Sequence, residues 1–83
     1  MTEKEIKLLG FEKSLSLDDY DPYYYYTYDV VKYGFSLISC TNVDIEKHDG
    51  WYIDIFNTEP HIRFYKFEEV QSLINLFTKR IVK

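Results

Sequence analysis

The sequence predicts an α+β domain in which a short N-terminal helix and a C-terminal amphipathic helix both cover one face of a three- to four-stranded antiparallel sheet. Three observations lead to this fold. Residues 67–83 carry one apolar stripe at helical spacing, and residues 23–57 contain stretches of alternating character typical of strands. A chain of 83 residues also has room for only one core, so we expect a single domain over residues 1–83.

The N-terminal helix is predicted in "TEKEIKLLGF". Thr2 and Glu5 have capping-box spacing, in which each side chain satisfies the other residue's free backbone N–H. Gly10 falls where a helix ends in a left-handed residue, and Phe11 is then placed to pack on Ile6. The following "EKSLSLDDYDP" has no sustained period, and we interpret it as a connector or an irregular edge segment.

The stretch "YYYYTYDVV", residues 23–31, is predicted to be a strand because it is rich in aromatic and β-branched residues. Alternation gives it two faces. One face consists of Tyr24, Tyr26, Tyr28 and Val30. The other consists of Tyr23, Tyr25, Thr27 and Asp29. Thr27 and Asp29 make the second set the more polar one, so we expect it to face solvent.

Further strands are predicted at "FSLISCT", after a turn at residues 32–34, and at "WYIDIFN", after a turn at Asp49-Gly50. Pro60 precedes a short fourth strand in "HIRFYKF", where its missing N–H suits a first residue or an edge. The helix over 67–83 follows the i, i+3, i+4, i+7 rule. Its apolar stripe consists of Val70, Leu73, Ile74, Phe77 and Ile81.

Charge is distributed unevenly along the chain, whose net charge is −4. Residues 14–62 carry nine acids against Lys32 and Lys47. Residues 63–83 carry five bases against Glu68 and Glu69. The acidic middle should repel phosphate and attract basic surfaces.

Cys40 is the single cysteine, so no internal disulfide is possible and a reducing compartment is favoured. The N-terminus is charged throughout, unlike a signal peptide, and no apolar run is long enough to cross a membrane. We therefore expect a cytoplasmic protein that does not interact with membranes. Cys40, His48 and His61 match no zinc spacing and no marked nucleophile, so neither catalysis, a metal nor a cofactor is expected.

The tyrosine-rich stretch favours a binding face. Tyrosine supplies a large, rigid contact area at low entropic cost, and neighbouring aspartates steer a basic partner. An aromatic sheet face can also stack single-stranded RNA or DNA, but phosphate contacts need Lys or Arg on the same face. A third alternative is a homodimer in which this face pairs with itself. The residues expected to bind a basic protein surface are Tyr20, Asp21, Tyr23, Tyr25, Asp29 and Asp54.

The sequence is small and acidic, contains no catalytic motif, and has an aromatic face in "DPYYYYTYD". In these respects it resembles the small phage-encoded inhibitors of bacterial defence, including anti-CRISPR proteins. The resemblance is one of class and carries no residue roles. It implies a stoichiometric, non-enzymatic inhibitor in the host cytoplasm. Such an inhibitor would dock on the basic nucleic-acid channel of a CRISPR nuclease or on its guide-RNA complex.

Overall fold

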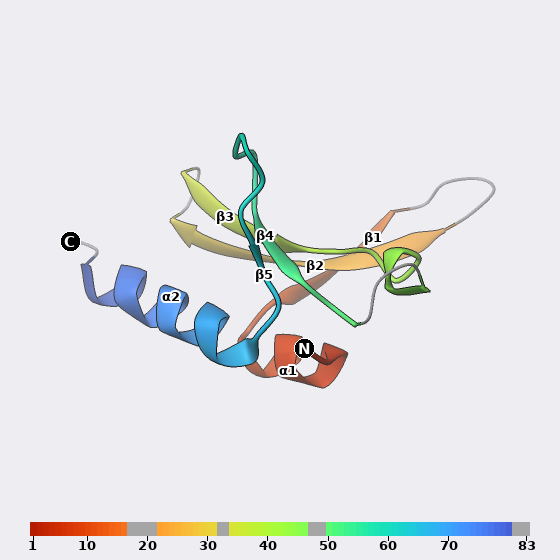
Figure 1. Cartoon of the computed structure of the whole chain (residues 1–83), viewed down its shortest axis with the longest axis horizontal. Helices are drawn as coiled ribbons and strands as arrows, with labels where there is room; N and C mark the ends of the chain where they lie inside the picture. The colour runs from red at the N-terminus through yellow and green to blue at the C-terminus, as the bar shows by residue number, and fades with distance from the viewer. Residues whose placement is uncertain (17–21, 32–33, 47–49, 81–83) are drawn as a thin grey trace.

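The computed structural model describes residues 1–16, 22–31, 34–46 and 50–80. It confirms the α+β fold: along the chain, one helix precedes and one helix follows the strands of an antiparallel sheet (Figure 1). The helices are α1 (Glu3–Leu8) and α2 (Phe67–Arg80), with one 3-10 turn, η1 (Asp44–Glu46). The strands are β1 (Glu12–Ser16), β2 (Tyr23–Val31), β3 (Phe35–Ser39), β4 (Ile53–Ile55) and β5 (Arg63–Phe64).

The strands follow one another across the sheet in the order β1-β2-β3-β4-β5, and every neighbouring pair is antiparallel. Both helices lie on the same side of this sheet, as the sequence predicts (Figure 1). The connection between β4 and β5, which contains Pro60, extends on the opposite side (Figure 1). One sheet face is therefore covered by helices, and the described residues place no helix on the other.

The sheet has five strands instead of the predicted three or four. The additional strand is β1, where the sequence indicates only a connector or an irregular edge segment. It pairs with β2 over its whole length, with Ser14 opposite Tyr25. The helix-side residues of β1 are Lys13 and Leu15, and both are exposed. An edge strand of this kind lacks the buried alternation by which strands are recognised.

Local signals position α1 as expected. Thr2 and Glu5 form the predicted capping box, with the Thr2 N–H donating to Glu5 Oε1 at 2.9 Å and the Glu5 N–H donating to Thr2 Oγ1 at 3.2 Å. Gly10 has a backbone φ of +96°, a conformation that residues other than glycine rarely adopt. The reversal lets Ile6 of α1 and Phe11, just before β1, enter the same core.

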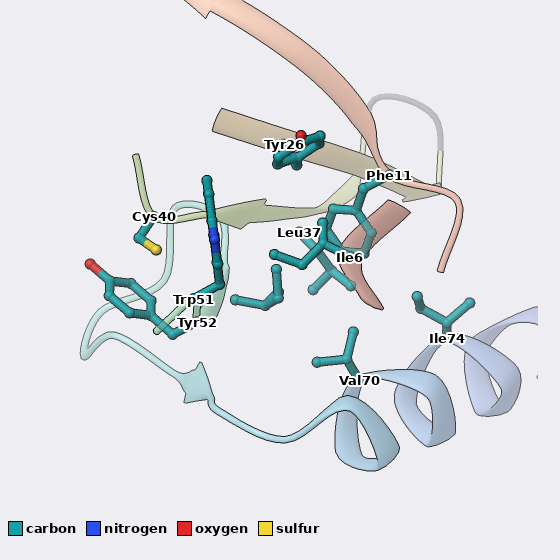
Figure 2. Close-up of a cluster of buried hydrophobic side chains, with 10 residues drawn as sticks. Ile6, Phe11, Tyr26, Leu37, Cys40, Trp51, Tyr52, Val70 and Ile74 are labelled. Atoms are coloured by element: carbon teal, nitrogen blue, oxygen red, sulfur yellow. The ribbon is translucent and has the colours of Figure 1, made fainter. Parts of the chain in front are cut away.

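The core lies between the helices and the covered face (Figure 2). Tyr26, Leu37, Ile53, Ile6 and Val70 are completely buried. Tyr24 and Tyr28 pack against this core, which confirms the predicted inward parity of β2. The alternation predicted for residues 51–57 holds less well, because Tyr52 is buried along with Trp51 and Ile53.

Hydrogen bonds satisfy the polar groups that enter the core from β2. The Tyr26 hydroxyl donates to the Glu3 carboxylate, which ties α1 to the sheet. The Tyr26 backbone N–H donates to Ser39 Oγ at 2.7 Å, and that hydroxyl donates to the Cys40 carbonyl at 2.8 Å. Ser39 is buried, so these bonds offset the cost of removing its hydroxyl from water.

Raising the pH above about 10 is expected to destabilise the protein through Tyr26. Burial, and then the hydrogen bond to Glu3, raise the pKa of Tyr26 above its usual value near 10. The unfolded chain then loses this proton at a lower pH than the folded chain does. The contribution of the Tyr26 hydroxyl to the free energy of unfolding is therefore fully present below about pH 10. Above that pH it falls by up to about 1.4 kcal/mol per pH unit.

Urea unfolding between pH 8 and 11 tests this expectation with Tyr26→Phe, which cannot titrate, as the control. The unfolding free energies of the two proteins should converge, or cross, as the pH rises above 10. Parallel profiles would contradict the assignment, because all other titrating groups are common to both proteins.

Several predicted features lie outside the described residues. They involve Tyr20, Asp21, Lys32, Lys47, His48, Asp49 and Ile81. The remainder of the predicted α2 stripe is present: Val70 and Ile74 are buried, and Phe77 stacks on Phe35 of β3 at 4.5 Å between ring centroids.

Candidate binding face

The face of the sheet opposite the helices, here called the open face, follows from the strand register. Residues directly opposite each other in antiparallel strands project on the same side. One row of opposed residues crosses all five strands on this side: Glu12, Thr27, Ile38, Asp54 and Arg63. Alternation along β2 adds Tyr23, Tyr25 and Asp29 to the same face.

Tyr23 and Tyr25 form a ring pair on the open face. Their centroids are 6.2 Å apart and their planes are tilted by 33°. They lie opposite Ser16 and Ser14 of the edge strand β1. Both tyrosines are partly exposed, in contrast to Tyr26 of the same strand, whose side chain is fully buried in the core. The predicted outward parity of Tyr23 and Tyr25 is therefore confirmed.

A shallow depression of about 270 Å³, here called the central hollow, lies beside Tyr25. Its lining comes from β2, β3 and the residue that follows β4: Tyr25, Thr27, Asp29, Ser36, Leu37, Ile38 and Phe56. Phe56 is 58% exposed, and its N–H donates to the Ser36 carbonyl at 2.9 Å, which anchors it beside the sheet. The hollow thus offers apolar surface from Ile38 and Phe56.

Asp54 lies on the open face but is not available as a free charge. Arg63 donates to both of its carboxylate oxygens, at 2.8 Å from Nε and 3.3 Å from Nη2. The hydrogen bond to Asp54 is the largest cause that raises the pKa of the Arg63 guanidinium. The guanidinium also lies over the Tyr52 ring, 3.8 Å from its centroid. Asp54 therefore braces β4 against β5. Its part in steering a partner stays a prediction.

Asp29 is better placed to meet a partner. Its side chain is exposed, and its Oδ1 accepts a hydrogen bond from Ser36 Oγ at 2.7 Å. Such a bond from a hydroxyl orients the carboxylate without neutralising it. Glu12, which is also exposed, lies across from Thr27 on the neighbouring strand. Two acids thus flank Thr27 on the open face.

The structure brings together three of the six residues predicted to bind a partner, namely Tyr23, Tyr25 and Asp29. It adds Asp54 to the same face in its ion pair, while Tyr20 and Asp21 lie outside the described residues. The prediction missed Glu12, Ile38 and Phe56. Phe56 shares the parity of Asp54 along the chain, so its face could have been inferred. Glu12 and Ile38 required the register of their strands.

Of the groups considered for catalysis or metal binding, Cys40 and His61 lie among the described residues. Cys40 is buried, and burial raises the pKa of its thiol, which keeps it protonated at neutral pH. His61 is exposed in the connection between β4 and β5. Over residues 1–16, 22–31, 34–46 and 50–80, no three side chains from His, Cys, Asp or Glu lie together as a metal site would require.

Among the described residues, neither α1 nor α2 has the length and apolar character needed to cross a membrane. Comparisons of the chain with protein-family models, with curated protein sequences and with solved structures yield no match.

Proposed function

We propose that this chain is a non-enzymatic binding module whose open face docks on a basic surface of another protein. The observation that carries the proposal is the Tyr23–Tyr25 ring pair, accessible on a sheet face that no described helix covers. Rigid, partly exposed tyrosines are favourable anchors for a protein interface, because little side-chain entropy is lost when they are buried.

The charges of the open face favour a basic protein over nucleic acid as the partner. Glu12 and Asp29 are exposed there, and the base contributed by the described strands, Arg63, is engaged by Asp54. Lys13 belongs to the other face, with its ammonium 4.2 Å from the Tyr24 ring centroid. Bases stacked on Tyr23 and Tyr25 would therefore bring phosphates to a face on which the described strand residues offer exposed acids but no unengaged base.

The resemblance to phage-encoded inhibitors extends this proposal to a partner class. A CRISPR nuclease presents basic channels for its guide RNA and target, and these would attract an acidic aromatic face. In this mode the protein acts by stoichiometric occupation of the channel. Acidic steering brings the surfaces together, and the tyrosines supply contact area.

The double variant Tyr23→Ala/Tyr25→Ala is expected to lose at least about tenfold in affinity, since central aromatic anchors are commonly worth 2 kcal/mol or more. The measurement is capture of a purified CRISPR nuclease, with and without guide RNA and after treatment with ribonuclease. The matched control is Leu8→Ala/Leu76→Ala, which removes two apolar side chains that are 71% and 53% exposed on the helices.

Loss of capture in the tyrosine variant alone, with circular dichroism unchanged, supports the proposal. Equal capture by all the proteins contradicts it. Binding that disappears after ribonuclease treatment favours the nucleic-acid alternative. A doubling of mass in light scattering that the tyrosine variant abolishes favours self-association.

A further inference from the structure

The open face contains three adjoining depressions that differ in character. The first, of about 280 Å³ and here called the acidic hollow, is lined by Gly10, Glu12, Thr27, Tyr28 and Asp29. The second is the central hollow. The third, of about 380 Å³ and here called the outer hollow, is lined by Gly34, Ser36, Phe56 and Asn57.

Neighbouring depressions share lining residues and therefore adjoin one another along the sheet; the three together are here called the trough. Thr27 and Asp29 belong to both the acidic and the central hollow. Ser36 and Phe56 belong to both the central and the outer hollow. The trough therefore crosses the strands from β1, past β2 and β3, to the residues that follow β4. At about 4.8 Å per strand, three strand spacings give a length of about 14 Å.

The chemistry of the trough changes along this length. At the β1 end two carboxylates, those of Glu12 and Asp29, flank the hydroxyl of Thr27. In the centre, Ile38 and Phe56 contribute apolar surface beside the Tyr25 ring. A ligand that fills both the acidic hollow and the central hollow needs a cation in the first and an apolar group in the second. Because the two hollows share residues, those groups must lie about 5–10 Å apart, or one to two strand spacings.

Resting on the proposed function, we propose that the trough binds an extended segment of the partner carrying an arginine two residues from a leucine-sized apolar side chain. In an extended segment, side chains two residues apart project on the same side and lie about 7 Å apart, which matches the two hollows. The planar guanidinium has five donors and can address two carboxylates at once. About four extended residues span the trough.

The occupant follows from charge complementarity. Asp29 Oδ1 already accepts from Ser36 Oγ at 2.7 Å, so the carboxylate is held at the junction of the acidic and central hollows. An arginine there would reach Asp29 and Glu12 together, while the adjacent apolar side chain covers Ile38 and Phe56. A segment with an acid in place of the arginine would meet two like charges.

A peptide titration tests this inference directly. The probe is an acetylated and amidated peptide, Ser-Gly-Arg-Ser-Leu-Gly-Ser, added to the isotope-labelled protein and followed by amide chemical shifts. Shifts are expected at Thr27, Asp29, Ile38 and Phe56. Peptides with Glu in place of Arg, with Ser in place of Leu, or with Arg and Leu adjacent should bind at least about fivefold more weakly, since each loses one hollow.

Two protein variants provide the reciprocal test. Asp29→Asn keeps the acceptor for Ser36 but removes the charge, and Phe56→Ala removes an exposed ring. Each substitution should lower the affinity of the protein for the peptide that contains Arg-Ser-Leu by about three- to tenfold. No shifts in the trough at the solubility limit, or equal binding of all four peptides, would overturn the inference.

Failure of this inference is distinguishable from failure of the proposed function. If Tyr23→Ala/Tyr25→Ala abolishes nuclease capture while Asp29→Asn and Phe56→Ala capture normally, the open face is the binding face and the trough inference is wrong. If capture is lost in the trough variants as well as in the tyrosine variant, both hold. If no variant on the open face affects capture, both fail.

Discussion

Tyr26→Ala is expected to lower the free energy of unfolding by about 3–5 kcal/mol, the range typical of large aromatic deletions in a core. Tyr26 is 0% exposed, and its ring lies edge-on to Trp51 with the centroids 5.6 Å apart. The substitution removes this contact and leaves a cavity beneath β2. It also removes the hydroxyl that donates to Glu3, so α1 loses a tether to the sheet.

Urea denaturation followed by Trp51 fluorescence measures this loss, because Trp51 packs directly on the deleted ring. Tyr25→Ala is the matched control: it is the same substitution one residue earlier on the same strand, on the open face. Its cost should stay within about 1 kcal/mol, the span of strand propensity. Equal losses in the two variants would show that Tyr25 is also buried, and the proposed binding face would then be incorrect.

Val70→Asp is expected to have an effect of similar size, about 3–5 kcal/mol, because it leaves an unpaired charge in the core. Val70 is 0% exposed and belongs to the buried stripe of α2 with Ile74 (Figure 2). A helix of 14 residues is only marginally stable alone, so its docking depends on this stripe. The aspartate should therefore release α2 from the sheet.

Helical circular dichroism and amide hydrogen exchange distinguish local release of α2 from global unfolding. Leu76→Asp introduces the same charge on the same helix at a position that is 53% exposed. It should change the unfolding free energy by less than about 0.5 kcal/mol. A comparable loss from Leu76→Asp would mean that the outer side of α2 is covered, contrary to the described packing.

The parts of the fold that the sequence predicts are those with strong local periodicity. The capping box of Thr2 and Glu5 and the stripe of Val70 and Ile74 both form as expected. The inward parity of Tyr24, Tyr26 and Tyr28 in β2 also follows from the sequence, because the polar residues Thr27 and Asp29 mark the opposite face of the strand as the solvent side. Strand β1 was missed because an edge strand with exposed helix-side residues has no buried alternation to detect.

The site was predicted less completely than the fold, because it depends on register between strands. Local sequence shows that Asp54 is acidic, but only the pairing of β4 with β5 places Arg63 opposite it and neutralises it. Likewise, Glu12 and Ile38 are brought beside Thr27 by two separate strand pairings. Tyr23 and Tyr25, in contrast, adjoin within one strand, so their shared face could be inferred.

The strand order has a consequence for how the chain reaches this structure. Each strand pairs with the strand next to it in sequence, so the sheet can grow strand by strand through connections much shorter than the separation of the two helices in sequence. Ile6 and Val70, by contrast, are far apart in sequence and meet in one core. The largest entropic cost of loop closure is therefore incurred when the N-terminal and C-terminal helices dock in the same core. The aromatic face on β2 can thus be assembled before the helices seal the opposite side.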